Sequence, residues 1–427
     1  MKISLKNIVL ASTIGVAFSL SIPAFADGKE VKLGLVTFLS GGAAGPFGIP
    51  ARNAAEVIIE AMNGGKLPAP YNSIGFAGAK INPIYIDENS KQKVADYKRL
   101  VQKDEVDMVI GYISSGSCKA IAPVAEEEKK LTIFFDCGTP QIFENIVTKP
   151  KYLFRTAAHA TMDNVAAARY TLDVVKNTSS IAGINQNYAW GQDSWRDFSA
   201  SMKVLKSGIT ISTEQFPKIF AGQYGSEISV LLTKKPDVVH SSFWGGDMEA
   251  LLIQGRGRGL FSRSQVILTT GETAMQRLGA QIPDGTIIGA RGPAGLLAPD
   301  NELNSWFKKV YFDRFGSYPT YPSYHMAQAI FAAKAASDKA GSAEQDKVKA
   351  ALKGLEFTTP SGLVSMALAD GHQAVSETAY GTYKYDKEAG KGTLVNVKRY
   401  AANCVNPPAD MNSIDWIKSG FKGADCK

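Results

Sequence analysis

Small residues and hydroxyl groups follow three apolar segments in the first third of the chain, and each of these segments is expected to be a strand. Gly41–Gly48 follows the first segment, Ser114–Ser117 the third and Asp136–Pro140 the fourth. Hydroxyls and free backbone N–H groups at a helix start bind carboxylates, because the helix dipole places partial positive charge there. We therefore expect Ser115 and Thr139 to hold an anionic group of a small molecule. The alternative is that Ser115 only caps its helix and that Thr139 is an ordinary turn residue.

Residues that could catalyse a reaction form no recognisable arrangement. The chain has four histidines, and no pair of them has the spacing of a metal or catalytic site: His159, His240, His325 and His372. The segment Gly255–Gly259 ends a predicted helix instead of opening one, so it is not a phosphate loop, and Gly41–Gly48 lacks the dinucleotide fingerprint. We therefore predict a protein that is not an enzyme and that carries no cofactor and no metal.

The four cysteines make an even count, which in an exported chain predicts two disulfides. Three pairings are possible from sequence alone. We favour Cys118 with Cys137 and Cys404 with Cys426, because the members of each pair are close in the chain. Metal binding is the weaker alternative, since no CxxC or Cys/His cluster has the spacing of metal ligands.

The N-terminal segment has the features of a secretory signal. Two lysines precede an apolar stretch, 8–20, and Ala24-Phe25-Ala26 follows it as an A-x-A cleavage site. The apolar stretch is shorter than the roughly 20 residues that span a bilayer. We expect residues 1–26 to be removed and the mature chain to diffuse freely in the periplasm, because Asp27 stands where a lipid-anchored protein would have cysteine.

Length and composition predict a two-lobed globular protein. A mature chain of about 400 residues is too long for a single hydrophobic core. The composition is ordinary, with 45% hydrophobic and 20% charged residues. The formal charge of +7 is spread along the chain without a basic stripe interleaved with aromatic residues, which argues against nucleic acid as a partner.

Short apolar strands alternate with amphipathic helices in two successive runs, one before and one after Phe154–Thr156. This alternation predicts an α/β protein with two parallel sheets, each covered by helices on both faces. Three further helices and a strand-rich tail complete the prediction. The expected strands are 31–38, 81–87, 106–113, 131–135, 181–185, 209–216, 238–244, 266–270, 363–368, 380–385 and 394–399.

The order of these segments resembles the type I periplasmic binding proteins, and most closely the leucine/isoleucine/valine-binding group of ABC-transporter solute receptors. The resemblance covers nearly the whole mature chain and is carried by Val31–Gly34, Gly45–Gly48, Ile110–Ser115, Ala122–Glu127, Tyr152–Thr156, Trp190–Gln192 and Phe243–Gly246. It implies two Rossmann-like lobes joined by three crossovers, with one ligand clamped between them by hinge closure. Lobe 1 is expected at 27–156 plus 292–372, and lobe 2 at 157–291 plus 373–427.

The resemblance also implies roles for particular residues. Ser115 and Thr139 match the groups that hold the ligand's carboxylate, with Gly138 or Asp136 as the contact if the match slips near Thr139. Trp190 matches an aromatic residue that covers the ligand, and Glu272 matches the group that pairs with an amino acid's ammonium. The alternative for Glu272 is a solvated residue at the start of a short helix.

Trp190 stands where the family usually has tyrosine, and the chain is longer than a typical branched-chain amino acid binder. Asp136 and Cys137 also stand where small residues are common, and together these departures argue against leucine, isoleucine or valine as the ligand. A cleft lined by aromatic residues would suit an aromatic or bulky ligand. Other aromatic residues that could line the cleft, or else pack in the core, are Phe47, Tyr112, Trp244 and Tyr324.

The implied function is the substrate-binding component of an ABC importer. The expected partners are an amino acid or an aromatic carboxylate and a permease in the inner membrane, and the protein is expected to be a monomer. The alternative is a free-standing sensor of the same fold, which would report its bound state to a signalling partner.

Overall fold

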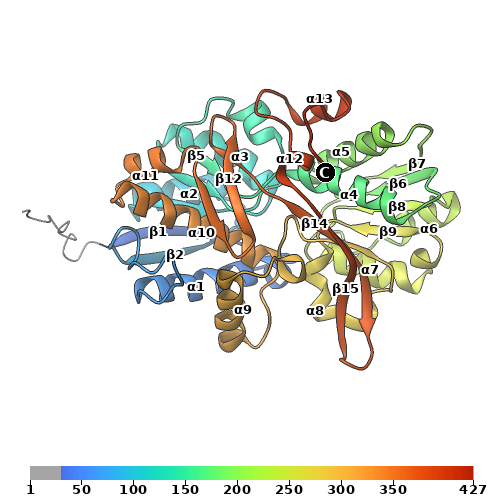
Figure 1. Ribbon diagram of the computed structural model, residues 1–427, viewed down its shortest axis with the longest axis horizontal. Helices are drawn as coiled ribbons and strands as arrows, with labels where there is room; N and C mark the ends of the chain where they lie inside the picture. The colour runs from blue at the N-terminus through green and yellow to red at the C-terminus, as the bar shows by residue number, and fades with distance from the viewer. Residues whose placement is uncertain (1–29, 427) are drawn as a thin grey trace, which may run out of the picture.

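The computed structural model describes residues 30–426. The predicted signal peptide, 1–26, therefore lies outside the described residues. Figure 1 shows two lobes side by side, each built on a sheet with helices on both faces. The predicted α/β class is confirmed, since each sheet is mostly parallel and gains antiparallel strands at one edge.

The first lobe contains an eight-stranded sheet in the order β11-β12-β13-β5-β4-β3-β1-β2. Six of the seven residues of β1 are buried, because helices cover both faces of this sheet. Helices α2 and α3 pack on one face, while α1, α9, α10 and α11 pack on the other. The strands are β1 (Val31–Thr37), β2 (Ile81–Asp87), β3 (Met108–Gly111), β4 (Thr132–Phe134), β5 (Leu153–Arg155), β11 (Glu356–Thr359), β12 (Gly362–Leu368) and β13 (Gln373–Val375). The helices are α1 (Ile49–Asn63), α2 (Lys93–Gln102), α3 (Ser115–Glu127), α9 (Glu302–Phe315), α10 (Tyr321–Ala340) and α11 (Gln345–Leu352).

The second lobe contains a seven-stranded sheet in the order β15-β14-β10-β9-β8-β6-β7. Helices α4, α5, α12 and α13 pack on one face, and α6, α7 and α8 on the other. The strands are β6 (Ser180–Ile184), β7 (Thr210–Gln215), β8 (Val238–Ser241), β9 (Gln265–Leu268), β10 (Ile287–Gly289), β14 (Thr378–Asp386) and β15 (Lys391–Tyr400). The helices are α4 (Ala160–Val174), α5 (Ala189–Leu205), α6 (Gly225–Lys234), α7 (Gly246–Gly257), α8 (Met275–Leu278), α12 (Ala402–Val405) and α13 (Ser413–Lys418).

The chain crosses between the lobes three times, after β5, after β10 and after β13. Strand β13 still pairs with β5 of the first sheet through Gln373 and Arg155, so the third crossing lies beyond the predicted boundary after residue 372. Three crossings that run close together can act as a hinge, because few backbone torsions have to change when the lobes move.

Most of the expected strands and helices agree with the structure. The predictions missed β5, β10, β11, β13 and the helix α4, and the tail contains two helices in addition to its strands. The missed strands have three or four residues, too few to show an alternating pattern, whereas the equally short β3 and β4 lie in longer apolar runs of the sequence. Helix α4 is buried on nearly all sides and so lacks the polar stripe that marks a surface helix.

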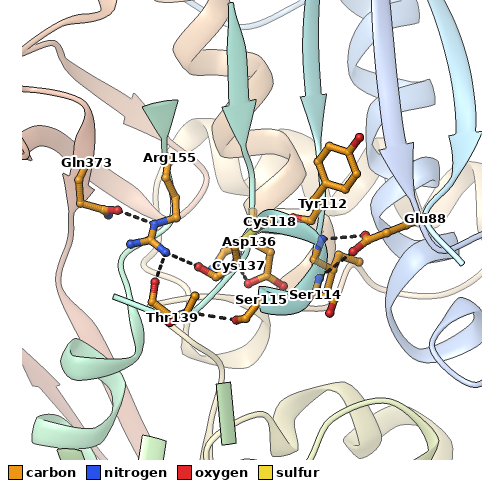
Figure 2. The surroundings of a disulfide bond; sticks show 12 residues. Glu88, Tyr112, Ser114, Ser115, Cys118, Asp136, Cys137, Thr139, Arg155 and Gln373 are labelled. Carbon is orange, nitrogen blue, oxygen red and sulfur yellow. Dashed lines mark hydrogen bonds and ion pairs between the residues drawn. A yellow bond between two sulfur atoms is a disulfide. The ribbon is translucent and has the colours of Figure 1, made fainter. Parts of the chain in front are cut away.

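Both favoured cysteine pairs are disulfides in the structure. Cys118–Cys137 joins α3 to the loop after β4 (Figure 2). Cys404–Cys426 links α12 to the residues after α13, and both helices lie against α4 and α5 of the second lobe (Figure 1). Within residues 30–426, no helix has both the length and the apolar composition needed to cross a lipid bilayer.

The C-terminal tail belongs to the second-lobe core, because Trp416 of α13 is fully buried there. Trp416→Ala is expected to lower the free energy of unfolding by about 3–5 kcal/mol, since it leaves a large cavity. Urea unfolding followed by circular dichroism measures this. Ile253→Ala on α7, where the side chain is 48% exposed, is the control and is expected to change the same quantity by less than about 0.5 kcal/mol. Equal losses for the two variants would show that the tail is only loosely attached.

Candidate ligand-binding site between the lobes

Loops that leave the carboxyl ends of strands in both sheets meet between the lobes, where parallel α/β sheets bind ligands. They enclose a small hollow of about 10 Å³, which we call the interlobe cavity. This volume is roughly that of one water molecule, so the lobes are closed on each other. The lining residues are Ile113, Ser115, Asp136, Gly138, Tyr188, Trp190, Trp244, Arg291 and Tyr321.

Four of the predicted site residues line this cavity: Ser115, Gly138, Trp190 and Trp244. Ser115 is the first residue of α3, and its Oγ accepts a hydrogen bond of 3.2 Å from the Thr139 backbone N–H. Trp190 packs directly on Gly138, where any Cβ would overlap the indole ring. Each indole N–H has an acceptor, because Trp190 donates to the Ser242 carbonyl and Trp244 donates to the Tyr188 hydroxyl.

The other predicted residues lie outside the lining. The Thr139 hydroxyl donates to Asp193 Oδ2 on α5 at 2.5 Å, so it joins the two lobes instead of facing the cavity. Glu272 is buried, and its carboxylate accepts the Tyr321 N–H at the start of α10 at 2.9 Å. Burial raises the pKa of Glu272 to about 7.

Phe47 supports the site from behind, because its ring packs edge-on against the lining residues Trp244 and Tyr321 at centroid distances of 5.1 and 5.3 Å. Tyr324 lies in the first-lobe core, where its hydroxyl donates to Asn304 Oδ1. Tyr112 likewise packs inside the first lobe, against Phe134.

Arg291 is the central charged residue of the cavity, and the sequence reasoning did not select it. It follows β10 at the second crossing and is only 4% exposed. Its guanidinium forms an ion pair with Asp136 of the first lobe and a second with Asp163 of α4, at 3.2 Å. The guanidinium also lies over the Trp190 ring, 4.6 Å from its centroid. Burial lowers the pKa of Arg291 to about 10, so the side chain stays cationic at neutral pH.

Burial shifts the pKa of two further titratable groups beside Arg291 toward their neutral forms. Burial raises the pKa of Asp163 well above its ordinary value, which favours the protonated acid. His325 lies 3.3 Å from Asp136 and 2.8 Å from the Arg291 carbonyl, and burial lowers its pKa to about 3. The cavity therefore contains the cation Arg291 with two carboxyl groups beside it, those of Asp136 and Asp163.

Two buried charged residues hold the first-lobe loops in place (Figure 2). Glu88 accepts the N–H groups of Ile113 and Ser114, both at 2.8 Å, and so fixes the loop that begins α3. Arg155 donates to the carbonyls of Cys137 and Thr139, both at 2.6 Å, and to the Gln373 side chain. No group of three or more His, Cys, Asp or Glu residues within 30–426 could hold a metal ion.

Asp136 is the alternative to Thr139 that the sequence offers, and position in the chain could also have identified Arg291. Asp136 follows β4 and Arg291 follows β10 by two residues each, as the strand-end rule requires. Arg291 was missed because β10 has only three residues and was not recognised as a strand.

Arg291→Met is expected to lower the free energy of unfolding by about 3–5 kcal/mol, because Asp136 is then buried without a cation. Adding Asp136→Asn is expected to recover most of this loss, as urea unfolding of the two variants would show. Lys309→Met is the control, because it removes an exposed ion pair with Asp313. It should lower the free energy of unfolding by less than about 1 kcal/mol. If the double variant is as unstable as the single one, the two residues are not energetically coupled.

Glu88 makes stability depend on pH, because burial raises its pKa to about 7 in the folded protein from 4.5 for an exposed glutamate. The folded protein therefore favours the protonated form of Glu88. The contribution of this group to stability is fully present below pH 4.5 and is lost as the pH rises toward 7. Glu88→Gln should remove this pH dependence, because glutamine does not titrate. Between pH 4.5 and 8, the free energy of unfolding of the native chain should therefore fall by roughly 3 kcal/mol relative to that of the variant. Urea unfolding at each pH gives the difference, and parallel curves for the two proteins would contradict the assignment.

Residues 30–390 match the periplasmic binding protein family. The leucine-, isoleucine-, valine-, threonine-, and alanine-binding protein of Pseudomonas aeruginosa is 25% identical over 354 residues, covering 81% of this chain and 88% of that protein. The Leu/Ile/Val-binding protein homolog 4 of Brucella abortus is 24% identical over 87% of this chain and 88% of its own length.

Solved structures share the fold. A solute-binding protein of an ABC transporter from Rhodopseudomonas palustris BisB5, in complex with 3,4-dihydroxybenzoic acid, has a TM-score of 0.76 and 21% identity, and the match covers 90% of this chain and 99% of that one. The leucine-binding protein LivK from Thermotoga maritima has a TM-score of 0.70 and 17% identity, over 86% and 98% of the two chains. With most of its length matched, this chain belongs to the periplasmic binding protein family.

Proposed function

We propose that this protein is the substrate-binding component of an ABC importer and captures a small carboxylate with an aromatic body between its lobes. The observation that carries the proposal is a buried guanidinium, that of Arg291, in a cavity walled by four aromatic rings. These rings belong to Tyr188, Trp190, Trp244 and Tyr321. The planar guanidinium suits a carboxylate, since the two groups form paired hydrogen bonds. The aromatic walls suit a flat apolar body, because aromatic rings stabilise one another beyond simple burial.

Ligand entry requires the lobes to separate. The interlobe cavity of about 10 Å³ is far smaller than the roughly 300–1,000 Å³ of small-molecule sites. Its lining comes from both lobes, so a rotation about the three crossings would enlarge it and expose Arg291 to an incoming anion. The lobes would then close on the ligand, and the site binds without catalysing a reaction.

Relatives support two ligand classes. One solute-binding protein from Rhodopseudomonas palustris is in complex with 3,4-dihydroxybenzoic acid and another with benzoate, which fits the aromatic walls. Several sequence relatives are named as binding proteins for amino acids. An amino acid is therefore the second candidate, and the observation that favours it is Asp136, whose carboxylate lies beside Arg291 and could accept an ammonium group. Glu272 is less suited to that role, since its carboxylate already accepts the Tyr321 N–H.

Asp136→Asn separates the two ligand classes. An amino acid should lose tenfold or more in affinity with this variant, which is about 1.4 kcal/mol, because its ammonium loses a charged partner. A benzoate should bind equally well or better, since the anion that competes for Arg291 is gone. Isothermal titration with 4-hydroxybenzoate, 3,4-dihydroxybenzoate, L-leucine and L-phenylalanine measures both effects.

The same compounds should raise the melting temperature of the native chain if they bind its folded state. If none of them raises it or gives heat on titration, the proposed ligand classes are wrong.

Membership of the family supports a proposal about location and partner. We infer that the protein acts in the periplasm, as a monomer that delivers its ligand to a permease of the inner membrane. The alternative is a free-standing sensor that reports its bound state to a signalling partner. Deleting the gene separates these roles, because loss of labelled ligand uptake indicates an importer, while loss of a transcriptional response with intact uptake indicates a sensor.

A further inference from the structure

A second and larger hollow lies away from the interlobe cavity, and we call it the hinge cavity. Its volume is about 890 Å³, within the range of sites that bind small organic molecules. The first lobe supplies the segment after β4, part of α11 and the turn between β12 and β13. The second lobe supplies the loop 407–412 between α12 and α13. Arg155 and His159, at the first crossing, complete the wall.

Both crossing residues that line this cavity have a buried polar atom without a hydrogen-bond partner among the described residues. Arg155 is fully buried, and its Nε and Nη1 donate to Gln373, Cys137 and Thr139, whereas Nη2 has no partner among the described residues. His159 is 4% exposed, and its Nδ1 also lacks a partner in that part of the chain. A buried donor without an acceptor costs free energy, so two such side chains in the wall of one cavity favour a ligand that supplies an acceptor.

The charges around the cavity favour an anion. Arg155 forms no ion pair with a carboxylate of residues 30–426, although burial leaves its pKa at about 9 and it remains cationic. The acidic Glu144 nearby is bound by the N–H and hydroxyl of Ser413. Burial lowers the pKa of His159 to about 3, so this imidazole is neutral and can donate from Nδ1.

Four lysines on the rim outnumber the acidic groups there. Lys149, Lys151, Lys349 and Lys353 line the cavity together with Glu144, Asp370 and Asp410. Two of these lysines are paired, Lys349 with Asp346 and Lys353 with Asp370. With Arg155 included, the lining has five cationic and three acidic side chains.

We propose that the hinge cavity is a second ligand site, which binds a small organic carboxylate through Arg155 Nη2 and His159 Nδ1. Apolar walls that include Phe143 and Tyr152 suit an organic body, which inorganic phosphate lacks. This site goes beyond the proposed transport function and is separate from the interlobe cavity, because the two cavities share no lining residue.

Titration of benzoate into the variant Asp136→Asn with Arg291→Met tests the proposal, since that background removes the charged groups of the interlobe cavity. Benzoate is expected to bind this background. Adding Lys149→Gln and Lys353→Gln should weaken the binding at least threefold, and so should His159→Phe, which removes the Nδ1 donor. Arg155 itself is not replaced, because it also holds the loop of Cys137 and Thr139.

The control pair, Lys103→Gln with Lys347→Gln, makes the same charge change on exposed parts of the same lobe and should leave the affinity unchanged. Equal weakening by both lysine pairs would overturn the proposal, because binding would then depend on net charge alone. Absence of benzoate binding to the background, or binding of inorganic phosphate in place of benzoate, would also overturn it. Crystals grown with 4-bromobenzoate locate the site directly, and a bromine peak between Arg155 and loop 407–412 is the expected result.

Discussion

The burial of one guanidinium between the lobes is the constraint on which the candidate site depends. A cation removed from water needs partners on every side, and Arg291 obtains them from both lobes. Asp136 comes from the first lobe, whereas Asp163, the Ala158 carbonyl and the Trp190 ring come from the second. Closing the lobes therefore completes the surroundings of this cation. An incoming carboxylate can pair with Arg291 as Asp136 does. Ligand binding and lobe closure therefore both depend on the charge of Arg291.

A second buried guanidinium connects the site to the hinge. Arg155 ends β5 at the first crossing, and it reaches the loop of Cys137 and Thr139 on one side and Gln373 of β13 on the other. Figure 2 shows this side chain between the two segments. The loop that carries Asp136 and the strand that precedes the third crossing are thus held by one residue. Movement of the hinge and the geometry of the ligand loop cannot be independent, because both depend on the same set of hydrogen bonds.

Local sequence patterns predicted most of the fold, although they missed the 15-residue helix α4, which lacks a polar stripe. They placed two alternating runs and hence two lobes, and the strand-end rule led to Ser115, because β3 was recognisable. The same rule failed for Arg291, since β10 has only three residues. Thr139 and Glu272 both follow strands, as the strand-end rule requires, but neither side chain lines the interlobe cavity. The Thr139 hydroxyl donates to Asp193, and the Glu272 carboxylate accepts the Tyr321 N–H. Those partners lie far away in sequence, so no local pattern could reveal them.

The C-terminal tail supplies one wall of the hinge cavity, and this wall lies outside the residues that match the family. The family match ends at residue 390, whereas the loop 407–412 that walls the hinge cavity lies beyond it. The tail is attached to the second lobe by Trp416 and by the disulfide of Cys404, and it reaches the first lobe where Ser413 meets Glu144. A wall fixed to one lobe and bonded to the other changes shape when the lobes move. The hinge cavity should therefore differ between open and closed forms, although its ligand never contacts the interlobe cavity.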